Sequence, residues 1–405
     1  MTRTAAPSRF DVGVLVVGGG VAGLETALAL RALGEGRVGV EILAPELHFF
    51  YRPLAVSEPF GGEPVRRWEL ADLARSAGAD FTPGELTAID AGEHVARLRS
   101  GPEIGYDAVV LACGARPVTA VPGSLTFRGP ADGDALRRLL DGLERAELRR
   151  LAFAVPTGIV WPLPLYELAL QTATELGRRG VSAELVFVTA EPSPLALFGT
   201  RASEAVRTAL AERGIELRTS TYAESFGEEG LVVRGGVLPV DGVVSLPRLS
   251  APDIAGVPRD RTGFVPTDPH GRVPGVPDVY AAGDLTAFPI KQGGLAAQQA
   301  DAVAETIAAA AGAPVEPRPF RPVLRALLLT GDAPTFLRVE LAGGHGETSE
   351  ASEEALWWPP GKIVGRYLAP FLAELGVLAV EPAHAEETER IELESIAAHE
   401  LGWPR

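Results

Sequence analysis

Short runs of apolar residues recur along the chain, and each is bounded by glycine, proline or charged residues. The clearest runs lie at 14–17, 108–113 and 279–282, and a further run at 39–43 is interrupted only by a glutamate. Such runs are typical of strands that are buried on both faces of a parallel sheet. Between the first two, Leu24, Ala27 and Leu28 repeat at helical spacing, and Gly34 is suited to end the helix. The pattern predicts a doubly wound α/β domain.

The same alternation of strand and helix is repeated in the middle of the chain. Apolar strand patterns at 151–155, 183–188 and 215–219 alternate with helical patterns near 165–176 and 201–213. We therefore predict two tandem Rossmann-like domains, the second inserted in the first. The first domain would comprise residues 1–120 and 265–315, and the second residues 121–264.

The last part of the chain has a different pattern. After a proline-rich stretch, residues 324–329 and 335–341 predict a pair of strands, and residues 364–379 carry an apolar stripe. We assign residues 316–405 to a small C-terminal α+β region that covers the ligand site or forms an interface, with a homodimer left open. Residues 1–10 and the acidic stretch 381–400 are predicted to be solvated tails.

The turn after the first strand carries the most specific motif. Gly18, Gly20 and Gly23 fit the G-x-G-x-x-G spacing, with Val21 and Ala22 between them. In this motif the glycines allow a tight turn, close approach of a pyrophosphate to backbone N–H groups, and close packing of helix on strand. Residues 34–39 show the same spacing, but they follow a helix and precede a strand, so no helix N-terminus faces a ligand there.

The second strand ends without the acidic residue that usually contacts the ribose of a dinucleotide. Ala44 occupies that position, and Glu46, two residues further on, is either its substitute or a solvated loop residue. The aromatic loop 48–54, which includes Arg52 and Pro53, is too apolar for a simple turn. Loops of this kind often cover a flat ring.

Composition excludes several classes of partner. A formal charge of −16 in 405 residues argues against nucleic acid and against electrostatic adhesion to anionic lipid. No run reaches 18 apolar residues and no signal sequence is recognisable, so we expect a cytoplasmic protein, with peripheral membrane contact left open. Cys113 is the only cysteine, which excludes an intramolecular disulfide and a cysteine-held iron–sulfur cluster. We predict no metal site.

Two further motifs identify a family. Tyr106–Pro117 is a buried strand that runs into a glycine turn, and Asp278–Asp284 is another that ends in a glycine and a carboxylate. With the first turn, they resemble the three motifs of the two-dinucleotide-domain FAD oxidoreductases, which include the pyridine nucleotide-disulfide oxidoreductases. The resemblance implies bound FAD, with Asp284 on its ribityl chain. The cofactor-binding candidates are Gly18, Gly20, Val21, Ala22, Gly23, Ala44, Glu46, Arg52, Pro53, Leu86, Ala112, Cys113, Gly114, Gly283, Asp284, Lys291, Gly293 and Gly294.

The corresponding turn of the second domain departs from the motif. Residues 156–164 contain one glycine, three prolines and Trp161. The prolines remove N–H donors, and the bulky Trp161 would obstruct a pyrophosphate. We therefore do not expect NAD(P)H to bind at the usual place. This departure, the aromatic segment before Pro53 and the Pro289–Gly294 segment resemble sulfide:quinone oxidoreductases and flavocytochrome c sulfide dehydrogenases. That resemblance implies that Lys291 lies near the flavin and the acceptor, where its charge would stabilise the reduced flavin. Lys362, the only other lysine, is a weaker candidate.

The resembling enzymes oxidise sulfide through a pair of cysteines beside the flavin, and this chain has no cysteine after Cys113. We expect Cys113 to be a small buried structural residue. The sequence thus predicts an FAD-dependent oxidoreductase that passes electrons from an unidentified small-molecule donor to a quinone-like acceptor without persulfide chemistry. One alternative is an NAD(P)H:acceptor oxidoreductase resembling the type II NADH dehydrogenases. Another is a non-catalytic scaffold that holds a flavin or is empty.

Overall fold

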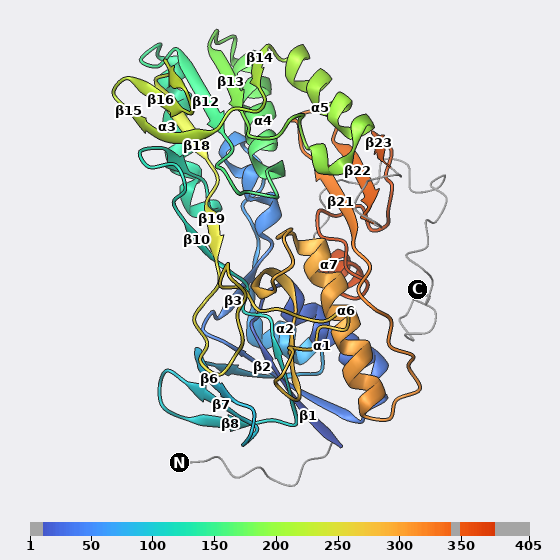
Figure 1. Cartoon of the computed structure of the whole chain (residues 1–405). Helices are drawn as coiled ribbons and strands as arrows, with labels where there is room; N and C mark the ends of the chain where they lie inside the picture. The colour runs from blue at the N-terminus through green and yellow to red at the C-terminus, as the bar shows by residue number, and fades with distance from the viewer. Residues whose placement is uncertain (1–10, 342–348, 377–405) are drawn as a thin grey trace.

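A computed structural model describes residues 11–341 and 349–376 of the chain (Figure 1). The predicted tails at 1–10 and 381–400, and the end of the predicted apolar stripe at Leu378, lie outside these residues.

The first domain is built on a five-stranded parallel sheet in the order β20-β9-β1-β2-β5. Its strands are β1 (Val12–Val17), β2 (Val38–Ala44), β5 (Asp80–Pro83), β9 (Ala108–Leu111) and β20 (Val279–Ala281). Alternate side chains of β1 enter two separate hydrophobic clusters, because the sheet is covered on both faces.

Different layers cover the two faces of this sheet. One face packs on helices α1 (Val21–Leu33), α2 (Leu70–Ser76) and α6 (Gly293–Ala310). The other packs on the antiparallel strands β6 (Leu86–Asp90) and β7 (Val95–Leu98), which continue into β8 (Glu103–Gly105). Helices α1 and α6 lie side by side (Figure 1).

The second domain repeats this architecture between β9 and β20 of the first. Its parallel sheet has the order β11-β18-β12-β13-β14. The strands are β11 (Leu125–Thr126), β12 (Arg150–Ala154), β13 (Glu184–Val188), β14 (Ile215–Arg218) and β18 (Gly242–Ser245). One face packs on α3 (Gly133–Glu144), α4 (Leu163–Arg179) and α5 (Thr200–Glu212), and the other on β15 (Ala223–Gly227), β16 (Gly230–Val233) and β17 (Gly236–Leu238). The predicted fold class, with one Rossmann-like domain inserted in another, is therefore confirmed.

Two antiparallel strands form the connection between the domains. They are β10 (Arg116–Val118) and β19 (Arg248–Ser250), and the chain enters and leaves the second domain along them (Figure 1).

The C-terminal part contains the predicted strand pair and adds a third strand. β21 (Val323–Leu328), β22 (Thr335–Glu340) and β23 (Glu350–Ser352) form an antiparallel sheet that packs on the second domain, and α7 (Leu368–Glu374) packs on the first.

The aromatic segment after β2 is more regular than the predicted loop. Its first residues form β3 (His48–Phe50), which pairs with β4 (Arg67–Glu69), and two 3-10 helices follow, η1 (Arg52–Val56) and η2 (Glu58–Phe60). Phe49 and Tyr51 are buried, whereas Arg52 remains exposed. The segment thus packs against the hydrophobic cores of both domains.

Buried polar contacts fasten residues 349–376 to the first domain. The Glu25 carboxylate, completely buried in α1, accepts hydrogen bonds from the N–H groups of Tyr367 (2.8 Å) and Leu368 (2.7 Å) at the start of α7. Ile363 N–H donates to the Tyr51 hydroxyl at 2.9 Å. Burial raises the pKa of Glu25 and, more strongly, that of the neighbouring Asp301, which the charge of Glu25 raises further.

Candidate cofactor and substrate site

The glycines of the first turn have different structural roles. Gly18 has φ +123°, and a Cβ there would lie 2.3 Å from the Ala112 carbonyl oxygen. A Cβ on Gly23 would lie 1.9 Å from the Gly18 carbonyl oxygen, so these two glycines permit the packing of α1 on the sheet. A Cβ on Gly20 would meet nothing within 4 Å. Gly20 therefore leaves an open surface at the turn, as the approach of a ligand requires.

The start of α1 can receive an anion. Gly20 caps the helix without a side-chain hydrogen bond, and the first turn contains no acidic residue. Within the described residues, the N–H groups of Val21, Ala22 and Gly23 have no hydrogen-bond partner, as is usual at the start of a helix. Free N–H groups and the helix dipole fit the pyrophosphate of FAD.

The candidates beyond β2 differ in accessibility. Ala44 is completely buried, and its carbonyl accepts a hydrogen bond from Gly84 N–H at 2.9 Å. Glu46 is exposed beyond the strand end and has no hydrogen bond or ion pair in the described part of the chain. Leu86 belongs to the core under β6 and β7, so its side chain is not at a ligand surface.

The expectation that Cys113 is buried is wrong. Ala112 is buried, but residue Cys113 is exposed, because the chain leaves the sheet at the end of β9 and passes Gly18 at its open carboxyl edge. The surrounding protein still limits the hydration of the thiol and raises its pKa. Gly114 follows with φ +67°, a conformation that favours glycine.

The third motif places a carboxylate at the end of β20. Gly283 has φ +80°, and its N–H donates to Gln299 Oε1 at 2.7 Å. Asp284 is half-buried, and its carboxylate has no hydrogen-bond partner in the part of the chain that the structure describes. Burial raises its pKa, which the charges of Lys291 and Arg52 oppose. An unpaired carboxylate here fits a hydroxyl-rich ligand chain. Sequence reasoning missed Gln299, which holds this turn from α6.

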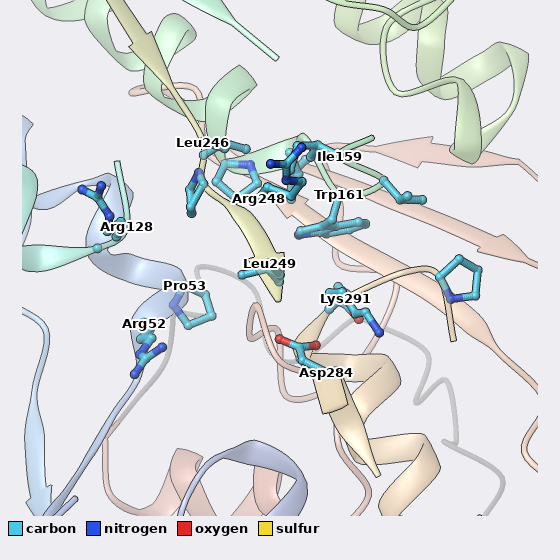
Figure 2. A pocket seen from close by; sticks show the side chains of 18 of the residues that line it. Arg52, Pro53, Arg128, Ile159, Trp161, Leu246, Arg248, Leu249, Asp284 and Lys291 are labelled. Atoms are coloured by element: carbon cyan, nitrogen blue, oxygen red, sulfur yellow. The ribbon is translucent and has the colours of Figure 1, made fainter. Parts of the chain in front are cut away.

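A cavity of about 780 Å³ lies between the two domains and the C-terminal sheet. It brings together several predicted residues from distant parts of the sequence, namely Arg52, Pro53, Asp284, Lys291 and Gly293. Figure 2 shows Asp284 and Lys291 on one side of it and Trp161 and Ile159 of the second domain facing them. The first turn, Ala44, Glu46 and Cys113 lie outside its lining, and Gly294 is buried behind Gly293.

Lys291 is partly desolvated at the cavity wall. Its ammonium donates to the Thr286 carbonyl and lies 3.9 Å from the centre of the Phe264 ring. Burial lowers its pKa to about 8, while Asp284 and Asp260 act in the opposite direction. Lys291 is therefore mainly charged at neutral pH and loses its charge in mildly alkaline solution.

Lys362 forms a buried ion pair that the sequence did not indicate. Its ammonium lies 2.6 and 2.7 Å from the two carboxylate oxygens of Glu167 and donates to the Pro53 carbonyl at 3.0 Å. Glu167 also accepts from Leu329 N–H at 2.9 Å. Both charged groups line the cavity, and the pair connects the second domain to the C-terminal segment. The partners are 195 residues apart, so no local pattern could have joined them.

The start of α4 in the second domain has few N–H groups left for a ligand. Pro164 has none in the first turn of α4, and Leu165 N–H donates to the Pro162 carbonyl at 2.9 Å. Beyond β13, Thr189 stands at the strand end, and Glu191 follows two residues later. The Glu191 carboxylate accepts hydrogen bonds from the hydroxyls of Tyr166 (2.8 Å) and Thr189 (3.0 Å), and burial raises its pKa.

Among residues 11–341 and 349–376, no group of three or more His, Cys, Asp or Glu side chains is arranged to hold a metal ion. No helix within the same ranges is long and apolar enough to cross a membrane.

The fold and the three motif turns define a two-domain flavoprotein oxidoreductase. The sequence pattern of the pyridine nucleotide-disulphide oxidoreductases matches residues 12–154 and 167–310, and the chain belongs to this family. It is accordingly an FAD-dependent oxidoreductase. Membership of this family favours an enzyme over the alternative of a non-catalytic scaffold.

The chain is similar to some known proteins in sequence and to others in structure. An NADH dehydrogenase-like protein of Mycobacterium tuberculosis is 30% identical over 299 residues, which cover 68% of this chain and 72% of the relative. A type II NADH:quinone oxidoreductase of the same organism is 28% identical and covers 78% and 77%. In structure, the chain resembles the sulfide:quinone oxidoreductase of Aquifex aeolicus with a TM-score of 0.75, at 22% identity, over 84% of this chain and 86% of that one. The last likeness shows the fold alone.

Proposed function

We propose that the protein transfers electrons from a small-molecule donor to a quinone-like acceptor at a bound FAD, without a persulfide step and without NAD(P)H bound at the turn of the second domain. The observation that carries the proposal is the cavity: Asp284 and Lys291 form one side, and Trp161 of the second domain occupies the other (Figure 2).

The chain's own residues would bind and orient the cofactor, which supplies the two-electron chemistry. The start of α1 at Gly20 would receive the pyrophosphate, and the free carboxylate of Asp284 would accept hydrogen bonds from ribityl hydroxyls. Lys291 would place a positive charge beside the ring system, where reduction adds electrons.

The walls of the cavity favour a flat apolar substrate. Trp161, Phe264, Phe288 and Leu249 all line it, and they offer aromatic and aliphatic surface. No cysteine lines it, so a covalent sulfur intermediate has no attachment point there. A quinone-like ring can stack against such walls and exchange electrons without a covalent bond.

A second candidate function is NADH:quinone oxidoreduction. It is favoured by the names of two relatives that are similar in sequence, an NADH dehydrogenase-like protein and a type II NADH:quinone oxidoreductase. Against it stand the prolines of the second turn and the internal hydrogen bonds of Glu191.

Anaerobic reduction of the bound flavin by a panel of donors tests the proposal. Purified holoprotein is mixed in a stopped-flow instrument with NADH, NADPH, sulfide and a reduced quinol, and the absorbance of oxidised flavin is followed. We expect the quinol to equilibrate with the flavin, NADH and NADPH to act slowly, and sulfide to give no long-wavelength charge-transfer band. Fast and saturable bleaching by micromolar NADH would establish the second candidate instead.

A further inference from the structure

The lining of the cavity reverses the charge balance of the chain. The sequence has 53 acidic residues and 37 lysines and arginines. The cavity is lined by five cationic side chains, those of Arg52, Arg128, Arg248, Lys291 and Lys362. Only three carboxylates line it, those of Glu167, Asp260 and Asp284. A cationic cavity in an acidic protein attracts anions selectively from solution.

Most of these charges already have partners. Lys362 pairs with Glu167 at 2.6 Å, and Lys291 and Arg52 act electrostatically on Asp284. Asp260 accepts hydrogen bonds from the N–H groups of Thr262 and Phe264 within its own turn.

Within the described residues, Arg248 is a charge without a partner on the second domain's side of the cavity. Its guanidinium has no ion pair or hydrogen bond with any residue in the part of the chain that the structure describes. Arg128, the other remaining cation, donates to the Thr126 carbonyl (3.0 Å) and the Thr119 hydroxyl (2.9 Å), and it lies 3.5 Å from Asp132. These contacts orient the Arg128 side chain and leave further N–H donors available.

The backbone fixes Arg248 at the junction of the domains. It is the first residue of β19, and it lies opposite Val118 in the antiparallel pair with β10. Figure 2 shows Arg248 on the side of the cavity away from Asp284 and Lys291, with Trp161 and Leu249 between them in this view. A molecule that reaches from the flavin side to Arg248 would therefore cross an apolar middle section.

We propose that the cavity binds a ring-bearing organic anion, with its ring against Trp161 and its carboxylate, sulfonate or phosphate group at Arg248. The inference rests on the proposed function, because it names the class of substrate that meets the cofactor in this cavity. The volume of about 780 Å³ would be shared between the flavin ring system and a molecule of two or three rings. An arginine fork recognises carboxylate, sulfonate and phosphate alike, so the charged group is specified only as an anion.

Binding of redox-inert probes to the FAD holoprotein tests the inference directly. Naphthalene-2-sulfonate and 2-naphthol share one ring system and differ in charge, and the visible difference spectrum of the bound flavin reports both. We expect the sulfonate to bind at least about tenfold more tightly at low salt, and the advantage to shrink as salt is added. Equal affinities at low salt would overturn the proposal.

A matched pair of variants locates the charge. Arg248→Gln is expected to weaken sulfonate binding about tenfold and to leave 2-naphthol binding within about twofold. Arg207→Gln removes the same charge from an exposed position of α5, outside the cavity lining, and should change neither probe. If the two variants behave alike toward the sulfonate, Arg248 is not the anion site.

Two further measurements distinguish the anion site from a dinucleotide site and from the proposed electron transfer. ADP-ribose should not displace the sulfonate, because the start of α4 has few N–H groups for a pyrophosphate. Displacement at micromolar concentration would assign Arg248 to a dinucleotide and overturn the proposal. Turnover with 1,4-naphthoquinone-2-sulfonate and 2-methyl-1,4-naphthoquinone tests the function itself. Charge-selective probe binding without reduction of either quinone would support the anion site and refute the proposed electron transfer.

Discussion

The two nucleotide-type domains share an architecture and differ at their ligand edges. Each has five parallel strands with helices on one face and a three-stranded antiparallel sheet on the other. In the first domain, the helix after the first strand leaves three N–H groups free at Gly20. In the second, the corresponding helix starts among Pro162, Leu163 and Pro164.

The acidic residues after the second strands show the same contrast. Ala44 and Glu46 in the first domain stand where Thr189 and Glu191 stand in the second, so both acids lie two residues beyond the usual position. Glu46 faces solvent, whereas Glu191 accepts hydrogen bonds from Tyr166 and Thr189. Similar folds therefore do not imply similar ligands, since the side chains at the strand ends decide what can bind.

The largest effect is expected from a side chain at the open glycine of the first turn. Gly20→Val should weaken FAD binding by about 100-fold or more, because a Cβ at this position has free space in the protein and would occupy the path of the pyrophosphate. The measurement is the flavin content after purification and reconstitution. Gly177→Val, an equally open glycine in α4 of the second domain, is the control and should purify yellow. A yellow Gly20→Val protein would remove the contrast between the domains.

The second domain should be nearly inert toward nicotinamide nucleotides. Equilibrium dialysis with NADH, NADPH and ADP-ribose should detect no micromolar binding, because prolines remove N–H groups from the turn before α4. Tight binding of any of the three would show that the dinucleotide uses other contacts, and the two domains would then be functionally alike.

Substitutions of Glu46 and Glu191 are expected to give an effect of intermediate size. Glu46→Gln should lower FAD affinity about tenfold if its carboxylate accepts ribose hydroxyls, since hydrogen bonds to charged groups contribute about 1.5–3 kcal/mol. Glu191→Gln keeps the acceptor for Tyr166 and should leave FAD affinity unchanged. Titration of the apoprotein with FAD measures both. An unchanged Glu46→Gln variant would assign Glu46 to the solvated surface.

The smallest expected effect concerns the charge of Lys291. Because burial lowers its pKa to about 8, the ammonium is present below that pH and is lost above it. We expect Lys291→Met to lower the reduction potential of the bound flavin by about 30 mV at pH 7, which corresponds to a tenfold change in equilibrium. The difference between variant and wild type should disappear above about pH 9. A difference that persists there would mean that the lysine acts through packing.

The sequence alone predicts those features that depend on a few consecutive residues. The order of strands and helices, the first turn and the loop ending at Asp284 each depend on a few consecutive residues, and the structure contains them. The predicted residues near the cavity come from segments that meet at the ends of parallel strands, a geometry that the fold class already implies.

Contacts between distant segments could not be predicted. Glu25 lies in a helix whose residues from Ala22 to Leu30 are all buried, and its partners Tyr367 and Leu368 are more than 340 residues away. Cys113 was misjudged because an apolar run predicts burial, although the run continues past the end of the strand to an open edge. The free charge of Arg248 is visible only when its surroundings are known.

The buried contacts of residues 349–376 with both domains have a consequence for the cooperativity of unfolding. Lys362 neutralises Glu167 of the second domain, and the backbone near Tyr367 satisfies Glu25 of the first, so one short segment compensates a buried carboxylate in each. If either domain unfolded alone, the segment would detach and leave an uncompensated charge in the other, a state that costs several kcal/mol. The two domains are therefore expected to melt in a single transition, and neither is expected to be stable when expressed by itself.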